Sequence, residues 1–371
     1  MANKMLRFPA PVQQPRNDAS LRPCDLKILF CILCEASMRV KVKKTRKELT
    51  ELFAAFGIFV VMLLPPMKSW ADDYPSRPVK VVVPFEPGGG NDLLARIIGE
   101  KLSDSLHQPF IIDNRPGAGT QIGAEIVARA APDGYTLLST SLTTYALNPS
   151  LYKTLPYDPA KDFVPVSLTG RFAFLLVANP KFPANSLDQL IAMAKSAPDT
   201  ITFASAGPGS PHQMAMELLL NRAGVKMVHV PYKGASPALK DLISGEVPVM
   251  MLDVATAREP IKAGLLKVLA SAAPERSAEF PNVRTIAEAG FPGYEASAWQ
   301  GIVAPAKTPH EIIEKLNGQI GAALADPAVK QRLQAAGIEP IQSTPESFAA
   351  YMQSETLKWQ GVIKAANISL N

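Results

Sequence analysis

The sequence predicts an α/β fold with mixed, largely parallel sheets, and three observations lead to this prediction. Apolar, β-branched runs alternate with segments of helical periodicity along most of the chain. Glycine-rich loops join several of these runs to the helical segment that follows. The composition, with 47% hydrophobic and 19% charged residues, is that of a globular protein with ample material for a core. Loops of this kind lie at the carboxyl ends of their strands, where open α/β sheets bind ligands.

The predicted elements follow one another in a regular order. Strands are expected at 79–85, 109–114, 135–141, twice within 163–180, at the start of 201–224, at both ends of 225–253, at 265–273 and at 296–306. Helices are expected at 92–106, 115–131, 186–197, in the second half of 201–224, in the middle of 225–253 and over 308–335. Ser186 is a predicted helix cap, because its side chain can accept a hydrogen bond from the first turn.

Residues 38–71 have the organisation of a secretory signal peptide. A basic cluster at 39–47 precedes 13 apolar residues at 52–64, and the small residues Ser69 and Ala71 follow. We expect cleavage after Ala71 and a periplasmic mature protein. The alternative is a membrane anchor, but 13 residues fall short of the roughly 20 that span a bilayer.

Residues 1–37 do not fit in front of such a signal, which should begin at the N-terminus. We therefore expect Met38 to be the true start and 1–37 to come from a misassigned gene start. All three cysteines, Cys24, Cys31 and Cys34, lie in that stretch. The predicted mature protein then has no disulfide, no thiol chemistry and no cysteine-based metal site.

The charge balance does not indicate a nucleic-acid-binding protein. The chain has a net charge of +5, but residues 1–71 hold 12 basic and 5 acidic residues. The remainder holds 26 basic and 28 acidic residues, a net charge of −2. A basic groove for a phosphate backbone is therefore not expected.

Three glycine-rich loops, 86–91, 115–120 and 205–212, each precede a predicted helix. The free N–H groups and the dipole at a helix start attract anions without any charged side chain. Single loops of this kind often only make tight turns. Three of them with neighbouring Ser, Thr, Asn and Asp residues favour a polar pocket for an anion.

Two enzyme classes compete with this interpretation. Gly88 and Gly90 begin a dinucleotide-binding pattern, and Asp113 fits its acidic residue, but Leu93 stands where the third glycine belongs. Ser210 and His212 could suggest a hydrolase, but they lie two residues apart in a turn with no evident acidic partner. The four histidines form no metal-binding pattern, and His229, within an apolar strand, is expected to be a core residue.

Eight blocks of sequence, in order, then point to a known family: PFEPGGGND, NRPGAGTQIGAE, PDGYTLL, NPSLY, LPYD with DFVPVS, SAGPGSPH, VHVPYKGASPALKDLISG and FPNVRTIAEAGFPGYE. In these blocks the chain resembles the substrate-binding component of tripartite tricarboxylate transporters, the Bug family. The resemblance runs from about Tyr74 to the end of the chain.

The resemblance implies a two-lobed periplasmic binding protein of the type II kind, with the ligand in a cleft between lobes of mixed sheet and flanking helices. One lobe would comprise 74–177 plus 300–371, and the other 178–299. The implied function is capture of a di- or tricarboxylate, an acidic amino acid or an aromatic acid, and its delivery to the permease subunits of the transporter. A cofactor-free monomer without enzyme activity is expected. A receptor for a sensor kinase and a Rossmann-like NAD-dependent enzyme remain alternatives.

The resemblance also implies a set of ligand-binding residues: Phe85, Gly88, Gly89, Gly90, Asn91, Ser141, Thr144, Ser205, Gly207, Gly209, Tyr232 and Asp253. The N–H groups from Gly88 to Asn91 would face a carboxylate, and the hydroxyls after the third strand would donate to it. Phe85 and Tyr232 would line the cleft, and Asp253 would face an amino group or a water molecule.

Some residues depart from the family pattern. The block containing His212 is one residue shorter than usual, which leaves this histidine without an assigned role. Glu86 replaces a small or apolar residue and is expected to point outward, and Asp92 is expected to cap a helix. No arginine clamp is evident unless Arg115 or Arg171 reaches the cleft.

Overall fold

The structure, a computed structural model, describes residues 74–370 with the exception of Ala278. The predicted extension, signal peptide, cleavage site and cysteines therefore lie outside the described residues and stay predictions. Within the described part of the chain, no helix has the length and apolar character needed to cross a membrane. The same residues contain no cluster of His, Cys, Asp and Glu suited to a metal ion.

Strands and helices alternate through the described chain. The strands are β1 (Val79–Val83), β2 (Phe110–Asn114), β3 (Thr136–Ser141), β4 (Phe163–Ala178), β5 (Thr202–Ser205), β6 (Val228–Pro231), β7 (Val249–Asp253), β8 (Lys267–Ser271), β9 (Ser297–Pro305) and β10 (Glu339–Pro340). The helices are α3 (Gly90–Leu106), α4 (Gln121–Ala128), α5 (Asn148–Leu151), α6 (Pro159–Asp162), α7 (Leu187–Ser196), α8 (Pro211–Ala223), α9 (Ala235–Ser244), α10 (Val254–Lys262), α11 (His310–Ala325), α12 (Pro327–Ala335) and α13 (Pro345–Ala365), with the short helical turns η1 (Ala118–Thr120) and η2 (Thr143–Leu147).

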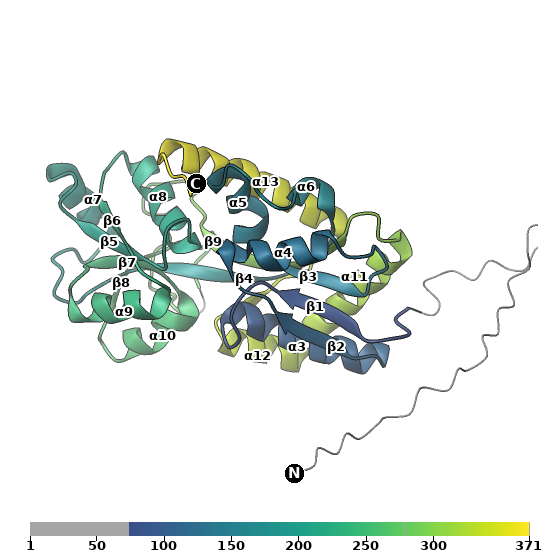
Figure 1. The fold of residues 1–371 in the computed structure, drawn as a ribbon. Helices are drawn as coiled ribbons and strands as arrows, with labels where there is room; N and C mark the ends of the chain where they lie inside the picture. The colour runs from purple at the N-terminus through teal and green to yellow at the C-terminus, as the bar shows by residue number, and fades with distance from the viewer. Residues whose placement is uncertain (1–73, 278, 371) are drawn as a thin grey trace, which may run out of the picture. The chain divides into compact units, whose positions relative to one another are not determined.

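The predicted two-lobed α/β fold is confirmed, and the sheets are mixed. In the first group, β1 pairs in parallel with β2 and β3, and β9 joins β3 antiparallel. In the second group, β5 pairs in parallel with β6 and β7. β4 connects the groups, because it pairs antiparallel with β9 in its first part and with β7 and β8 in its second (Figure 1). The residue boundaries of the two lobes stay a prediction.

The prediction of two strands within 163–180 is wrong, because β4 is one continuous strand of 16 residues. Gly170, in the middle of this strand, serves close packing. A Cβ atom at this position would lie 2.8 Å from Leu94 and 3.1 Å from Ile338. The glycine therefore lets α3 and the segment before β10 approach the strand backbone.

The segment 308–335 is helical, as predicted, but the end of the chain holds a further helix. The segment 308–335 forms two helices, α11 and α12, because Asp326 caps α12 through the N–H groups of Ala328 and Val329. Helix α13 was not predicted, and it packs against η2, α8 and β4. The Ser186 cap is confirmed, since its side chain accepts a hydrogen bond from the Gln189 N–H at 3.3 Å.

Three apolar clusters hold these layers together. One lies between the first sheet group and α3, α11 and α12, and another lies between the second group and α9 and α10. The largest cluster reaches from η2 through α8 to α13, with Trp299, Phe348 and Trp359 among its buried members. This last cluster sets the position of the strands and helix starts that surround the site described next.

Candidate ligand-binding site

A cavity of about 780 Å³ opens where several helices begin. Its lining comes from the loop before α3, the turn after β3, the first turns of α8, α9 and α10, and the strands β4 and β9. Such a volume falls in the ordinary range for small-molecule sites. Residues from both sheet groups contribute, so the site depends on the whole described fold.

The start of α3 forms one wall of the cavity. Gly88 has a φ of +89°, a left-handed conformation that favours glycine, and Gly89 precedes the first helical residue. No described side chain caps this helix. The first N–H groups of a helix have no carbonyl partner inside it, so this start can donate to an anion.

Asp92 lies inside the first turn of α3 and holds the loop in place, which corrects the prediction that it is the helix cap. Its carboxylate accepts hydrogen bonds from the Gly88 N–H, the Arg96 guanidinium and the Asn114 amide, at 2.8 to 2.9 Å. Burial raises the pKa of Asp92, but these bonds outweigh that effect and hold the pKa below its ordinary value. Asn114 also donates to the Phe85 carbonyl at 3.1 Å.

Hydroxyl groups border the cavity beyond the end of β3. Ser141 and Thr143 belong to the lining, whereas Thr144 lies behind them and is fully buried. The Ser141 and Thr144 hydroxyls share a hydrogen bond of 3.0 Å, and Thr144 donates to Thr120 at 3.0 Å. Thr144 is thus placed to orient Ser141, which faces the cavity.

His212 and Asp253 form a polar pair on the side of α8 and α10. Both residues line the cavity, and His212 Nε2 lies 3.8 Å from Asp253 Oδ2, too far for a hydrogen bond. Both ring nitrogens of His212 are buried without a hydrogen-bond partner in the described protein. Asp253 caps α10 by accepting from the Thr256 N–H at 2.9 Å. Burial raises the pKa of Asp253, but His212 and Thr256 offset this and leave it below its ordinary value.

Aromatic rings provide the apolar lining: Phe85, Phe172, Phe174 and Trp299. Phe172 lies next to the start of α3, since a Cβ atom on Gly90 would come within 2.7 Å of its ring. Phe174 packs against His212, with ring centroids 5.1 Å apart. These two phenylalanines are two residues apart on β4 and therefore face the same side of the strand.

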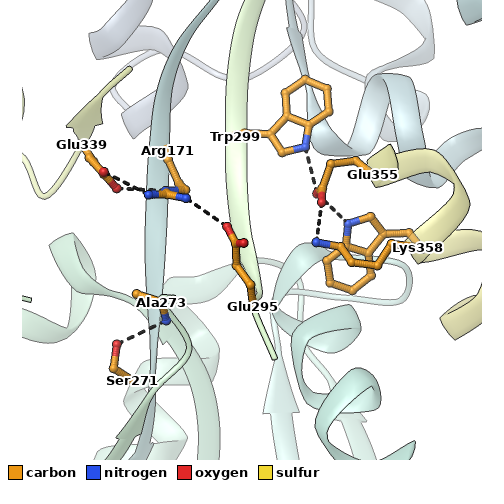
Figure 2. Close-up of polar contacts among 9 residues, drawn as sticks. Arg171, Ser271, Ala273, Glu295, Trp299, Glu339, Glu355 and Lys358 are labelled. Atoms are coloured by element: carbon orange, nitrogen blue, oxygen red, sulfur yellow. Dashed lines mark hydrogen bonds and ion pairs between the residues drawn. The ribbon is translucent and has the colours of Figure 1, made fainter. Parts of the chain in front are cut away.

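The indole of Trp299 is held in place by a hydrogen bond to α13. Its N–H donates to the buried carboxylate of Glu355 at 3.2 Å, and the same carboxylate accepts from Trp359 at 2.9 Å and pairs with Lys358 (Figure 2). The polar edge of this indole is therefore occupied, and Trp299 offers only ring surface to the cavity.

The structure brings seven of the predicted site residues together around the cavity: Phe85, Gly88, Gly89, Gly90, Asn91, Ser141 and Asp253. The other five do not belong to its lining: Thr144, Ser205, Gly207, Gly209 and Tyr232. A role of any of these twelve in binding stays a prediction.

The predicted residues of the 205–212 loop shape the turn before α8. The Ser205 hydroxyl accepts from the Gly207 N–H at 3.1 Å, and the Gly209 N–H donates to Gln213 at 2.8 Å. Gly207 has a φ of +131°, which explains the glycine. Tyr232 instead donates its hydroxyl to Asp241 at 2.9 Å. His229, which was expected in the core, is only half-buried; its ring stacks on Phe203 and lies 2.6 Å from the Ser205 hydroxyl.

The charged residues left open by the sequence stay outside the lining. Glu86 is exposed, as expected, and Arg115 pairs with Asp113 at 2.9 Å. Arg171 binds Glu295 and Glu339 where β4 meets β9 and β10 (Figure 2). It lines a second cavity, of about 750 Å³, together with Arg258 and other charged residues.

Several lining residues were missed by the sequence analysis, among them Phe172, Phe174, Ser210, His212 and Trp299. Ser210 carried a signal that could have been found, because Ser followed by Pro is a common helix start, and its side chain accepts from the Gln213 N–H at 3.4 Å. The aromatic residues carried none, since apolar residues in strands are usually core.

Comparisons with known proteins agree with this architecture. Residues 94–368 match the family model described as tripartite tricarboxylate transporter family receptor. Protein BugT of Bordetella pertussis is 39% identical over 87% of this chain and 99% of its own. The solved structure of Rhodopseudomonas palustris Rpa4515 with adipate has a TM-score of 0.72 at 36% identity, covering 80% of this chain and 99% of that one. MatC from the same organism, with bound malate, has a TM-score of 0.68 at 38% identity, covering 78% and 100%.

Proposed function

This chain belongs to the tripartite tricarboxylate transporter receptor family, and from that premise we propose that it captures a small carboxylate and delivers it to the permease of such a transporter. The family consists of periplasmic receptors and not of enzymes, so an NAD-dependent dehydrogenase is no longer an alternative. We propose in addition that this chain is exported to the periplasm and acts there as a monomer.

The observation that carries the proposal is the open start of α3 inside the cavity. Asp92 takes up the Gly88 N–H and so fixes the loop, while the following N–H groups have no partner within the helix. A carboxylate placed there would accept several hydrogen bonds and would meet the positive end of the helix dipole. Thr143 adds a hydroxyl group beside it, whereas the Ser141 hydroxyl proton is already donated to Thr144.

We further propose that binding closes the cleft between 74–177 plus 300–371 and 178–299. The chain passes between the two sheet groups along β4 and again between β8 and β9, and such element ends can serve as hinges. Closure would exclude water from the carboxylate and strengthen its hydrogen bonds. The ligand would be released unchanged to the membrane subunits.

The test is a thermal-shift and calorimetry screen of the protein after export into the periplasm from its full-length gene. The panel contains mono-, di- and tricarboxylates, amino acids and aromatic acids, with NAD as the comparison compound. A ligand at about 100 times its Kd stabilises the protein by roughly 2.7 kcal/mol. We expect at least one carboxylate to do so and to be recovered with unchanged mass. A response to NAD alone would overturn the proposal.

Delivery to a permease needs a second experiment in cells. Deletion of the gene should abolish uptake of the labelled ligand, and reintroduction of the wild-type gene should restore it. Normal uptake combined with a lost transcriptional response would instead support the sensor-kinase alternative.

A further inference from the structure

The charges that line the cavity are unevenly distributed. Within the described residues, the lining includes the carboxylate of Asp253 and contains no Lys or Arg. An anionic ligand must therefore be held by helix starts and hydroxyl groups. The number of open helix starts therefore limits how many carboxylates the site can accommodate. This inference rests on the proposed function.

The four helix starts around the cavity are not equivalent. Ser210 caps α8 and Asp253 caps α10, so a side chain already occupies each of these starts. The start of α9 has no side-chain cap, but its third residue is Pro237, which has no N–H to donate. Only α3 presents three successive N–H groups without a capping side chain.

The pair formed by Asp253 and His212 needs hydrogen-bond donors from the ligand, whereas the start of α3 needs an acceptor. The Asp253 carboxylate is ionised at neutral pH, because its pKa lies below the ordinary value. Next to it, both ring nitrogens of His212 are buried and unpartnered. A ligand group that donates hydrogen bonds, such as a hydroxyl or an ammonium, would satisfy the Asp253 carboxylate and the unprotonated ring nitrogen of His212. A second carboxylate would be repelled by Asp253.

Strand β4 sets the distance between the start of α3 and the pair formed by Asp253 and His212. Phe172 lies beside Gly90 at the start of α3, and Phe174 lies beside His212. In the register of β4 with β7, Phe174 is also paired with Asp253. Residues two apart on a strand are separated by about 7 Å. The rings of Phe172, Phe174 and Trp299 line the cavity, and together with this distance they favour an apolar ligand body about as long as one benzene ring.

We infer that this protein binds a monocarboxylate whose apolar body carries a hydroxyl or ammonium group at its far end. The carboxylate lies at the start of α3, the apolar body lies among the phenylalanines, and the donor faces Asp253 and His212. This class differs from the simple dicarboxylate adipate named with the solved relative Rpa4515.

The experiment compares two matched series by calorimetry at neutral pH and constant ionic strength. The ring series is benzoate, 4-hydroxybenzoate, 2-hydroxybenzoate and terephthalate, and the chain series is hexanoate, 6-aminohexanoate and adipate. We expect 4-hydroxybenzoate or 6-aminohexanoate to bind at least tenfold more tightly than the parent acid of its series. The dicarboxylates should bind most weakly, and 2-hydroxybenzoate, with its donor at the wrong spacing, should gain nothing.

Asp253→Asn removes the charge while Asn can still cap α10. This variant should lose the preference for the donor-bearing acids and should bind the dicarboxylates at least tenfold better than the wild type does. Asp326→Asn is the matched control, because Asp326 also caps a helix but lies outside the cavity. It should keep the order of affinities of the wild type.

The outcomes separate this inference from the proposed function. Tightest binding of adipate or terephthalate would place a second carboxylate at another helix start and overturn the inference, while the proposed function would stand. An unchanged order in Asp253→Asn would overturn it equally. If none of these acids binds but another carboxylate stabilises the protein, the inference fails alone. A thermal shift with NAD only would overturn both the inference and the proposed function.

Discussion

The indole N–H of Trp299 on β9 and the carboxylate of Glu355 on α13 form a buried hydrogen bond of 3.2 Å (Figure 2). Through this bond the last helix of the chain supports a ring of the cavity lining. Trp359 and Lys358 bind the same carboxylate, so one acidic group satisfies three buried or half-buried donors. The stability of the fold and the shape of the site are thereby linked.

Glu355→Ala should destabilise the protein by about 2–4 kcal/mol, because it leaves two buried indole N–H groups and a lysine without their partner. Glu355→Gln keeps one acceptor oxygen and should cost less. Urea unfolding followed by tryptophan fluorescence measures this directly, since both described tryptophans contact Glu355. Gln353→Ala, exposed on the same helix, is the control, and an equal loss in the two alanine variants would contradict the prediction.

Asp92→Asn should weaken both stability and carboxylate binding. The amide cannot accept all three hydrogen bonds that Gly88, Arg96 and Asn114 donate, so we expect a loss of about 1–3 kcal/mol. The loop before α3 should then no longer be held for a ligand. Denaturant unfolding and calorimetry measure the two effects. Asp104→Asn, exposed on the same helix, serves for comparison and should change neither quantity.

Gly89→Ala should separate binding from folding. A Cβ atom at Gly89 would have no other atom within 4 Å, and the residue has no left-handed φ, so alanine fits without strain. The added methyl would project beside the helix start that we propose for the carboxylate. We expect affinity to fall at least tenfold, with stability within about 0.5 kcal/mol of the wild type. Unaltered affinity would exclude this helix start as the carboxylate site.

Gly318→Ala is the matched substitution away from the site. Gly318 is exposed within α11, and nothing lies within 4 Å of the position that a Cβ atom would take. Alanine in a helix interior is favoured over glycine by about 0.5–1 kcal/mol, so the variant should be more stable and should bind normally. A denaturation midpoint at or below that of the wild type would disagree with this expectation.

His229 should make the protein lose stability in mild acid. Burial lowers the pKa of His229 from 6.5 to about 4. Between these values the unfolded chain binds a proton that the folded protein does not, so stability falls as the pH drops from about 6.5 to about 4. Because the ring is only half-buried, we expect an effect of roughly 1–2 kcal/mol.

The measurement for His229 is urea unfolding at pH 7.5 and pH 4.5. His229→Gln keeps a hydrogen-bonding group near Ser205 but does not titrate. The difference in stability between the two pH values should be smaller in this variant than in the wild type by about the same amount. Parallel losses in both proteins would assign the acid sensitivity to other groups.

The sequence correctly predicted the strands and helices whose local signals are strong. The β-branched run of β1 and the Ser186 cap of α7 depend on neighbouring residues only, so their conformations follow from local chemistry. The prediction of two strands within 163–180 was wrong, and the packing of Gly170 in β4 against Leu94 and Ile338 depends on contacts that the local sequence does not contain. The start of α13 at Thr344 and Pro345 carried a local signal that the prediction overlooked.

The sequence by itself determined the family, the α/β class and the glycine loop in front of α3, because these depend on residue order and on backbone conformations that glycine permits. Only the tertiary structure decided which helix starts border one common cavity. It also brought His212, Phe172 and Trp299 to one cavity from positions far apart in the chain. Strand pairing and side-chain packing create these contacts, and no spacing along the sequence encodes them.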